Sequence, residues 1–464
     1  MPSRPQRKTG GAPKRRRVDL PRQAALEVLV AVRADDAYTN LVLPATLARH
    51  GLSGRDAGFV TELASGTIRR QGTYDAIIAA CSDRPLVKVQ AKVLDVLRLG
   101  THQLLAMRVP DHAAISATVD LARDRVGAGA AGFVNAVLRK VAAHDLDSWI
   151  RRVSTEATFS SVAHSHPAWV VEKLAEALGE AAPTELDALL AADNVSPKVT
   201  LVARPGLCER DELVAAGAEE LPYSPYAAAL DGGNPGEVAA VAEGRAGVQD
   251  EGSQLVALGL AQAALGGPDL NWLDLCAGPG GKAALLAALA ASRGARVLAV
   301  ERQPHRAGLV ARATAASQAG LRGVLCADGT RPAWPSGYFD RVLVDAPCSG
   351  LGALRRRPEA RWRRKPSDLE ALVPLQQALL DSAIEAVRPG GLVLYATCSP
   401  VLAETADVVQ TALQRHPEMV LEDLSNSGAL AAIPDAAGPL PGTIQLWPHR
   451  HGTDAMFLAL LRRP

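Results

Sequence analysis

The stretch Leu273-Asp-Leu-Cys-Ala-Gly-Pro-Gly-Gly-Lys282 leads from an apolar segment directly into a predicted helix. Gly278, Gly280 and Gly281 carry no side chain, so the backbone of this turn can approach a ligand closely. The N-terminus of the following helix favours negative charge. The stretch therefore indicates a ligand-binding turn between a strand and a helix.

A phosphate-binding P-loop is the first candidate for this turn. That motif needs Ser or Thr directly after its lysine, but Ala283 follows Lys282. Cys276 also stands where the first glycine of the motif belongs. The P-loop is therefore excluded.

A dinucleotide site and an S-adenosylmethionine site both remain. The spacing Gly278-x-Gly280-x-x-Ala283 satisfies the relaxed dinucleotide fingerprint. Glu301 ends the next predicted strand and could bind the ribose hydroxyls of either cofactor. Asp328 ends the strand after that and could accept a hydrogen bond from an adenine amino group. These acids favour a cofactor that contains adenosine, but the glycine pattern alone does not separate the two classes.

The region around this turn alternates between strands and helices. Predicted strands are Trp272–Cys276, Arg296–Glu301, Gly323–Ala327, Arg341–Asp345 and Leu392–Thr397, and the predicted helices between them are Ala283–Ser292, His305–Gln318, Leu369–Val387 and Leu402–Gln414. Such alternation predicts a Rossmann-like α/β domain with a parallel sheet, which we place at residues 246–464. Ligands of such sheets bind beyond the carboxyl ends of the strands.

The remainder of the 464-residue chain is long enough for further domains. Residues 1–18 contain seven Lys and Arg and no acid, which predicts a disordered basic tail. Residues 19–145 show helical periodicity and predict an all-α module, with a helix opened by Pro21 and further helices at Arg55–Arg70, Val87–Met107, Ala113–Arg125 and Gly132–Val141. Residues 146–245 predict a small α+β linker or RNA-binding region, with a helix at Pro167–Leu178 and a strand at Val199–Ala203. The predicted fold class is thus multidomain.

The amino-acid composition limits the classes of protein to which this chain can belong. Hydrophobic residues make up 48% and charged residues 21%, which is typical of a globular protein. No apolar run is long enough to span a bilayer. Six cysteines are too few for a disulfide scaffold in a chain of this length, and favour reduced thiols in the cytoplasm.

The formal net charge of +1 conceals a second basic segment. Between residues 355 and 365, seven cations and one tryptophan are accompanied by a single acid, Glu359. This segment predicts RNA contacts through its charges and its aromatic ring: Arg355, Arg356, Arg357, Arg361, Trp362, Arg363, Arg364 and Lys365.

Two cysteines lie just beyond predicted strand ends, in Val344-Asp-Ala-Pro-Cys-Ser-Gly-Leu-Gly352 and Tyr395-Ala-Thr-Cys-Ser-Pro400. Neighbouring strand ends would place Cys348 and Cys398 on one edge of the sheet. No pair of cysteines has the short spacing of a zinc site and no histidine accompanies them, so we predict no metal and favour covalent catalysis.

We expect the other four cysteines to have non-catalytic places in the fold. Cys276 lies within the glycine-rich turn and is expected to line the cofactor pocket. Cys81, Cys208 and Cys326 are expected to be small buried hydrophobic residues.

The three motifs just quoted resemble those of RNA (cytosine-5) methyltransferases, specifically the RsmB/Sun group that acts on 16S ribosomal RNA. The N-terminal helices are similar to the NusB-like domain of that group, and Gly247–Ser253 resembles the segment that leads into its catalytic domain. The resemblance covers residues 20–464. It implies S-adenosylmethionine as cofactor and RNA as partner.

The resemblance also implies roles for individual residues. Cys398 would be the nucleophile, Cys348 would assist product release, Asp345 would contact the base, and Lys282 would help Cys398 to ionise. The implied cofactor site consists of Cys276, Ala277, Gly278, Pro279, Gly280, Gly281, Lys282, Glu301, Asp328 and Asp345. The chain departs from the family pattern in having Glu301 in place of the usual Asp, Gly278 in place of the usual Ala, and His451–Phe457 in place of the usual Asp-Gly-Phe-Phe.

Other functions remain as alternatives. They are a non-catalytic RNA-binding assembly factor of the ribosome, a tRNA cytosine-5 methyltransferase, and a nicotinamide-dependent oxidoreductase. The two intact cysteine motifs favour a cytosine-5 methyltransferase over the binding protein and the oxidoreductase, because neither of these requires them, and they leave the choice between rRNA and tRNA open.

Overall fold

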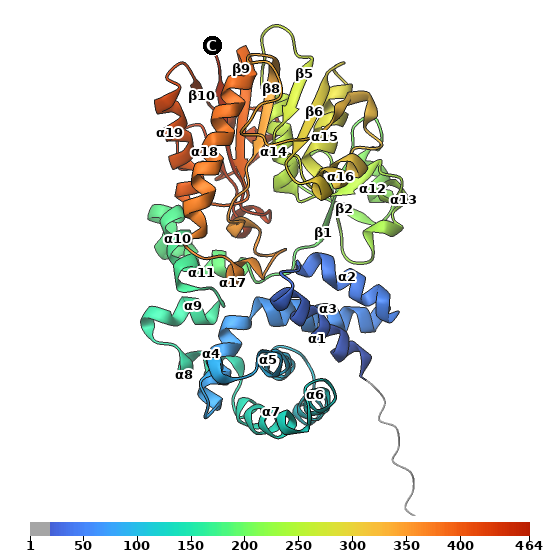
Figure 1. Ribbon diagram of the computed structural model, residues 1–464, viewed down its shortest axis with the longest axis vertical. Coiled ribbons are helices and arrows are strands. Elements are labelled where there is room, and N and C mark those ends of the chain that lie inside the picture. The colour runs from blue at the N-terminus through green and yellow to red at the C-terminus, as the bar shows by residue number, and fades with distance from the viewer. Residues whose placement is uncertain (1–18) are drawn as a thin grey trace, which may run out of the picture. The chain divides into compact units, whose positions relative to one another are not determined.

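The computed structural model describes residues 19–464, so the predicted basic tail lies outside the described residues. The chain forms two compact units, Met1–Val153 and Ser154–Pro464 (Figure 1). Among the described residues, none of the helices combines the length and the apolar character required to cross a membrane.

The described part of the first unit is all-α, which confirms the predicted helical module. The Asp19 carboxylate caps the first helix by accepting from the Arg22 backbone amide, and Pro21 lies in its first turn. Leu26, Val28 and neighbouring apolar side chains of this helix are buried in the core of the unit. The helices are α1 (Leu20–Ala34), α2 (Thr39–His50), α3 (Gly54–Arg69), α4 (Gln71–Cys81), α5 (Ala91–Leu105), α6 (Asp111–Arg125), α7 (Ala128–Val141) and α8 (Leu146–Val153).

The second unit begins with the middle region, which contains both helices and a small sheet, as predicted. The sheet is antiparallel, in the order β2-β3-β1-β4. Its strands are β1 (Val199–Ala203), β2 (Ala218–Glu220), β3 (Ala227–Leu230) and β4 (Ala246–Val248), and the helices are α9 (Phe159–Ala163), α10 (Ala168–Leu178), α11 (Ala182–Ala192), α12 (Arg210–Ala215) and α13 (Ala239–Ala242).

The middle region and the α/β domain lie in one compact unit, whereas the sequence suggested separate parts. Val202 of β1 belongs to the main core of the α/β domain. Val170 and Leu174 of α10 share another buried cluster with Leu351 and Trp447. Apolar surface of the middle region is thus buried against the α/β domain, and this burial joins the two parts.

The α/β domain is built on a mixed sheet in the order β10-β12-β9-β8-β5-β6-β7, with β11 paired to β12. The five strands predicted from sequence are parallel neighbours at its centre and one side. The strands are β5 (Asn271–Asp274), β6 (Arg296–Glu301), β7 (Leu321–Cys326), β8 (Phe339–Asp345), β9 (Val387–Thr397), β10 (Val420–Glu422), β11 (Ile444–Gln445) and β12 (Phe457–Arg462).

The antiparallel strands at the other side were not predicted. β12 pairs antiparallel with β9 and is buried along most of its length. Its sequence Phe-Leu-Ala-Leu-Leu-Arg is a continuous apolar run, and such a run does not distinguish a buried strand from a helix by periodicity. Its pairing partners therefore decide its conformation.

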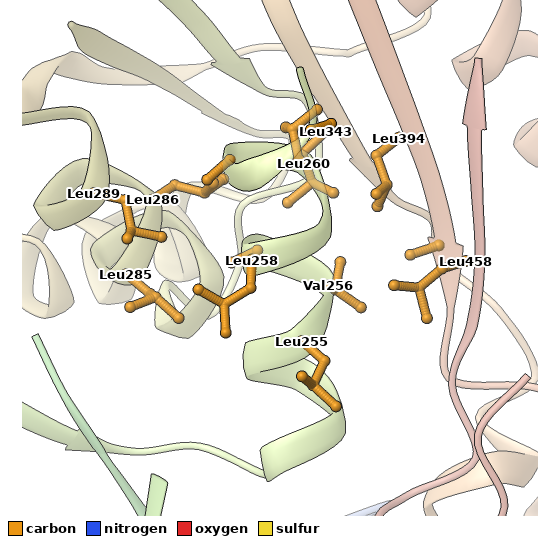
Figure 2. Close-up of a cluster of buried hydrophobic side chains, with 14 of the residues drawn as sticks. Leu255, Val256, Leu258, Leu260, Leu285, Leu286, Leu289, Leu343, Leu394 and Leu458 are labelled. Carbon is orange, nitrogen blue, oxygen red and sulfur yellow. The ribbon is translucent and has the colours of Figure 1, made fainter. Parts of the chain in front are cut away.

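Helices cover both faces of the sheet, as the alternation of elements predicted. Residues of α14, α15 and α16 share one core with Leu343 and Leu394, whereas residues of α18 and α19 share a second core with Val344 and Tyr395. In Figure 2, α14 lies between α15 and the strands: Leu258 of α14 points toward Leu285 of α15, and Val256 of α14 points toward Leu458 of β12. The helices are α14 (Glu251–Gln262), α15 (Gly281–Ala291), α16 (Pro304–Ala313), α17 (Ala360–Arg363), α18 (Asp368–Ala386), α19 (Ala406–Arg415) and α20 (Pro448–His451).

A glycine marks how closely the chain before β7 packs on α15. A Cβ atom on Gly320 would overlap the carbonyl oxygen of Ala287 and the amide nitrogen of Ala291, and backbone atoms of a helix cannot move aside easily. We expect Gly320→Ala to lower the free energy of unfolding by about 2 kcal/mol. Urea unfolding followed by circular dichroism measures the change.

Gly323→Ala is the matched control, because a Cβ atom there meets nothing within 4 Å. We expect its free energy of unfolding to stay within about 0.5 kcal/mol of the wild type. Equal effects of the two substitutions would contradict the packing argument.

Candidate active site

The candidate site lies where the strand order of the sheet reverses. The chain runs from β5 outward to β6 and β7, and then returns to place β8 on the other side of β5. The carboxyl ends of β5 and β8 are therefore neighbours at a topological switch point, where ligands bind in open α/β sheets. The acids Asp274, Glu301 and Asp345 end β5, β6 and β8.

The glycine-rich turn follows β5 and is anchored on the neighbouring strand. The Ala277 amide donates to the Val300 carbonyl at 2.8 Å. Gly280 precedes α15 with a φ of +116°, a conformation that favours glycine, and a side chain there would press on Val310 and Ala313 of α16. The Gly278–Pro279 peptide bond is cis. The turn thus brings backbone, rather than side chains, to the end of the sheet.

Asp345 and Lys282 form an ion pair across the switch point. The Lys282 Nζ donates to Asp345 Oδ2 at 2.9 Å, and both side chains are largely buried. Burial lowers the pKa of Lys282, but the attraction of Asp345 outweighs this and the pKa is raised overall. Lys282 is therefore a fixed cation held by a carboxylate, unlike the phosphate-binding lysine of a P-loop.

Asp274 is a site residue to which the sequence analysis gave no role. Its side chain is fully buried and its Oδ2 has no hydrogen-bond partner, while Oδ1 accepts from the Cys276 amide at 3.4 Å. Burial, and then the charge of Asp345, raise the pKa of Asp274 to about 7. The available signal was an acid within the predicted strand, two residues before Cys276, where the chain leads into the glycine-rich turn.

Glu301 and Asp328 lie at the ends of adjacent strands β6 and β7, as predicted. Glu301 is buried, and its Oε1 accepts from the Gln303 amide at 2.8 Å. Asp328 is partly exposed, and its Oδ1 accepts from the amide and the hydroxyl of Thr330 at 3.0 and 2.8 Å. Among residues 19–464, no hydrogen bond is donated to the second oxygen of either carboxylate.

Glu301 also lies against the glycine-rich turn. A Cβ atom on Gly278 would overlap Oε2 of Glu301. Arg306 lies 3.5 Å from the same carboxylate oxygen and donates to the Gly278 carbonyl at 2.6 Å. The two departures from the family pattern are thus in contact: the longer acid at 301 occupies space that the missing Cβ at 278 leaves open.

Cys348 and Cys398 are brought together at the ends of the adjacent parallel strands β8 and β9. Their sulfur atoms are 3.4 Å apart, and both side chains are partly buried. The hydrogen bond to Cys398 and burial raise the pKa of Cys348, whereas the hydrogen bond from Cys348 lowers the pKa of Cys398, with help from the positive charges of Arg357 and Lys282. These opposite pKa shifts favour a protonated Cys348 beside an ionised Cys398.

Cys276 is not part of this pair. Burial, and the charges of Asp274, Asp345 and Glu301, raise its pKa well above the ordinary value for a thiol. A thiol of this kind is a poor nucleophile. Its place inside the glycine-rich turn agrees with a lining role.

The basic segment requires a correction. Arg361 is fully buried, and its guanidinium donates to the Ser165 carbonyl, the Asn194 side chain and the Asp193 carbonyl. Arg355 is also buried and donates to the Gly452 carbonyl at 2.9 Å. These two guanidinium groups bind protein atoms inside the molecule, so the prediction that they contact RNA is wrong.

Arg356 is partly buried and is also committed to protein partners. It pairs with Asp250 and, at 3.2 Å, with Asp454. Burial, and then the proximity of Asp250, raise the pKa of Asp454 to about 6. The remaining members of the basic segment are partly or fully exposed: Arg357, Trp362, Arg363, Arg364 and Lys365.

Burial tests the expectation for the three remaining cysteines. Cys81 and Cys208 are buried, as expected, but Cys326 is exposed, because it ends the edge strand β7. Within residues 19–464, no group of three or more His, Cys, Asp or Glu side chains is arranged to hold a metal ion.

Comparison with known proteins assigns the chain to a class. Residues 266–462 match the family described as 16S rRNA methyltransferase RsmB/F, and residues 19–143 match the NusB family. A putative methyltransferase of Mycobacterium tuberculosis is 52% identical over 97% of this chain and 98% of its own length. The probable ribosomal RNA small subunit methyltransferase B of Bacillus subtilis is 32% identical over 95% of this chain and 98% of its own length.

Solved structures show the same fold. The crystal structure of PH0851 has a TM-score of 0.78 at 22% sequence identity and covers 96% of this chain and 99% of that one. NSun6 from Pyrococcus horikoshii with SFG has a TM-score of 0.53 at 18% identity and covers 64% of this chain and 98% of that one.

These matches define an S-adenosylmethionine-dependent RNA methyltransferase with a NusB-like N-terminal domain. The chain belongs to the RsmB/F methyltransferase family.

The residues of the site fit this cofactor chemically. S-adenosylmethionine carries a sulfonium and an ammonium group, and both cations are attracted to carboxylates. The site offers the carboxylates of Asp274, Glu301, Asp328 and Asp345, and Asp274 has one buried oxygen without a hydrogen-bond donor. The glycine-rich turn lets backbone approach the ligand closely.

The buried position of Arg361 has a measurable consequence. We expect Arg361→Ala to lower the free energy of unfolding by about 3 kcal/mol, because it leaves buried carbonyl groups and the Asn194 side chain without a donor. Lys365→Ala, which removes an exposed cation of the same segment, should change it by less than about 0.5 kcal/mol. Urea unfolding of both variants tests this, and a wild-type midpoint for Arg361→Ala would contradict the structural role.

Proposed function

We propose that this protein methylates C5 of a cytosine in 16S rRNA through a covalent bond between Cys398 and C6 of the base. The observation that carries the proposal is the thiol pair, Cys348 and Cys398, with sulfur atoms 3.4 Å apart beside the Lys282–Asp345 ion pair. The names of the relatives, ribosomal RNA small subunit methyltransferase B, support the small-subunit rRNA as target.

In this proposal the glycine-rich turn and the strand-end acids hold the cofactor. S-adenosylmethionine supplies an electrophilic methyl group when bound. Residues 276–282 line its binding site, Glu301 accepts hydrogen bonds from the ribose hydroxyls, and Asp328 accepts one from the adenine amino group. The carboxylates supply charge that complements the cationic cofactor.

Cys398 performs the nucleophilic step. The C5 carbon of cytosine is a poor nucleophile, and addition of a thiolate to C6 converts the ring to an enamine whose C5 can attack the methyl group. The hydrogen bond from Cys348 and the positive charges of Arg357 and Lys282 lower the pKa of Cys398 and favour its thiolate. The target base must leave its stack to reach this thiolate.

Asp345 and Lys282 assist the addition. Asp345, when it carries or shares a proton near ring N3, donates a hydrogen bond to that nitrogen and stabilises the negative charge that the addition places on the base. Lys282 holds Asp345 through the 2.9 Å contact between Nζ and Oδ2 and lies close enough to Cys398 to lower the pKa of that thiol. Asp345 and Lys282 therefore both favour the covalent adduct between Cys398 and the base.

Cys348 assists release of the product. After methyl transfer, the proton on C5 must leave before the C6–sulfur bond can break and Cys398 can depart as a thiolate. The Cys348 thiol first loses its own proton to solvent, and the resulting thiolate, directly or through a water molecule, accepts the C5 proton. Its position beside the Cys398 sulfur supports the assignment.

The exposed part of the basic segment is the proposed RNA contact. Arg357, Arg363, Arg364 and Lys365 supply charge for phosphates, and Trp362 supplies a surface on which a base can stack. The segment follows the Cys348 loop directly in the chain, which supports a contact close to the target nucleotide.

Substitution of the two cysteines tests the proposal. With labelled S-adenosylmethionine and 16S rRNA transcripts, Cys398→Ala should lower methyl transfer by roughly 10³-fold or more, because the variant lacks the thiolate that is proposed to add to C6. Cys348→Ala should instead accumulate a covalent protein–RNA species, seen as a shifted band on a denaturing gel.

Mapping 5-methylcytosine in rRNA from cells with and without the protein identifies the target. Full methyl transfer by Cys398→Ala would refute the nucleophile assignment. Methylation of tRNA in place of rRNA would refute the proposed substrate.

A double-mutant cycle tests how Gly278 and Glu301 share the cofactor site. Gly278→Ala alone should weaken S-adenosylmethionine binding by roughly tenfold, because the new Cβ displaces the Glu301 carboxylate. Adding Glu301→Asp shortens that side chain and should recover most of the lost affinity. Isothermal titration calorimetry measures both, and strictly additive losses would contradict the contact between the two positions.

A further inference from the structure

A serine follows each of the two cysteines, and neither serine has a role in the reaction proposed above. Ser349 and Ser399 are buried, and their hydroxyl oxygens are 3.1 Å apart. Both hydroxyl groups donate to the same atom, Oε2 of Glu404, at 2.5 and 2.6 Å. One carboxylate therefore joins the two loops that carry the thiols.

Glu404 is itself held firmly. Its side chain is fully buried, and its other oxygen, Oε1, accepts from the Ser349 amide at 2.7 Å and from the Gln376 side chain at 3.1 Å. The Tyr395 hydroxyl donates to the Glu404 carbonyl at 2.8 Å. Both carboxylate oxygens and the backbone of Glu404 are thus fixed.

A buried carboxylate without a cation is costly for a protein. Among residues 19–464, no Lys, Arg or His forms an ion pair with Glu404. Four hydrogen bonds from neutral donors satisfy it instead. Because such a group contributes little to stability compared with apolar packing, its presence points to a function of its charge and its bonds.

Other side chains complete the support of the Cys348 loop. The Gln376 side chain, in addition to its bond with Glu404, donates to the Pro347 carbonyl at 2.9 Å. Arg364 donates to the Ser349 carbonyl at 3.0 Å. Residues on both sides of Cys348 are therefore bonded to elements distant in sequence.

We propose that Glu404 is a positioning residue of the methyl-transfer reaction, which through Ser349 and Ser399 holds the sulfur atoms of Cys348 and Cys398 against each other. The inference rests on the proposed function, because it assigns these bonds to the thiol chemistry. Glu404 touches neither substrate nor reacting atoms in this scheme and acts only through the two loops.

The charge of Glu404 has a second, separable effect. The hydrogen bond to Cys398 and burial contribute most to the raised pKa of Cys348, and the negative charge of Glu404 raises it further. Titratable and charged groups that interact with the two thiols are Asp345, Lys282, Arg357, Tyr395 and Glu404. Glu404 therefore biases the pair toward a protonated Cys348 and an ionised Cys398.

Substitution by glutamine separates charge from geometry. In Glu404→Gln the amide oxygen can replace Oε1 as the acceptor of the two N–H groups, and the amide nitrogen can donate to the two hydroxyl groups, which rotate freely. All four hydrogen bonds can persist while the charge is lost. Glu404→Ala removes both the charge and the bonds.

Alkylation of the free enzyme by iodoacetamide, resolved by peptide mass spectrometry, reports the thiolate at each cysteine without RNA or cofactor. In Glu404→Gln we expect the rate at Cys348 relative to Cys398 to rise by several-fold, since loss of one negative charge lowers the pKa of Cys348. In Glu404→Ala, or in the double variant Ser349→Ala/Ser399→Ala, the rate at Cys398 should fall by roughly tenfold, as a rise of one pKa unit produces.

Ser292→Ala is the matched control. It removes a partly buried hydroxyl, which donates to the Leu289 carbonyl at the far end of α15, and should leave both alkylation rates at wild-type values. A purely structural role for Glu404 would lower the folded fraction but leave the ratio of the two rates unchanged. Wild-type rates at both cysteines in Glu404→Gln and Glu404→Ala would overturn the proposal.

Methylation kinetics then test whether the hydrogen bonds of Glu404 matter for the reaction. Glu404→Ala should lower kcat by roughly 10²-fold with the KM for RNA within about twofold, and Glu404→Gln should recover part of the loss. Wild-type kcat in both variants, in an enzyme that depends on Cys398, would overturn the positioning role alone. If the wild type methylates no RNA while thiol reactivity still depends on Glu404, the cytosine chemistry fails and the positioning of the thiols is supported.

Discussion

The parallel pairing of β8 with β9 is the constraint on which the site depends. It places Asp345 opposite Ala396, and the chain continues from these residues into the loops that carry Cys348 and Cys398. Both strands are buried on their two faces, with Leu343 in one core and Val344 in the other. A shift of one residue would exchange the faces of a strand, so the hydrophobic cores enforce the register that brings the two sulfur atoms to 3.4 Å.

Electrostatics at the switch point follow from the same topology. Strand ends that converge there place several carboxylates close together, and repulsion and burial raise the pKa of Asp274 to about 7. Lys282, fixed by Asp345, is the cation that the turn contributes. The acids suit a cationic cofactor, whereas the lysine and the Cys348 thiol favour negative charge on Cys398. The site therefore attracts a cationic cofactor through its acids and favours the Cys398 thiolate through Lys282 and Cys348.

The basic segment after the Cys348 loop has both buried and exposed members. Its buried members, Arg355 and Arg361, bind carbonyl groups and join the segment to residues far away in the chain. Arg364 reaches the carbonyl of Ser349, beside the thiol, and also lies partly exposed. The buried cations of this segment therefore support the loops that carry the thiols. Its exposed cations are the ones proposed to face RNA.

The sequence by itself determined the helical module, the five strands of the parallel sheet and the acids near their ends, because hydrophobic periodicity and turn residues are local properties. It also determined that two cysteines follow adjacent strands. Tertiary structure alone decided that Phe457–Arg462 is a strand, that Arg361 is buried and Cys326 exposed, and that Gly278 and Glu301 are in contact. It likewise decided the hydrogen bonds of Glu404, whose partners Ser349 and Gln376 are remote in sequence. The physical reason is that burial and hydrogen bonding depend on which distant residues the fold brings together, and no local pattern records those partners.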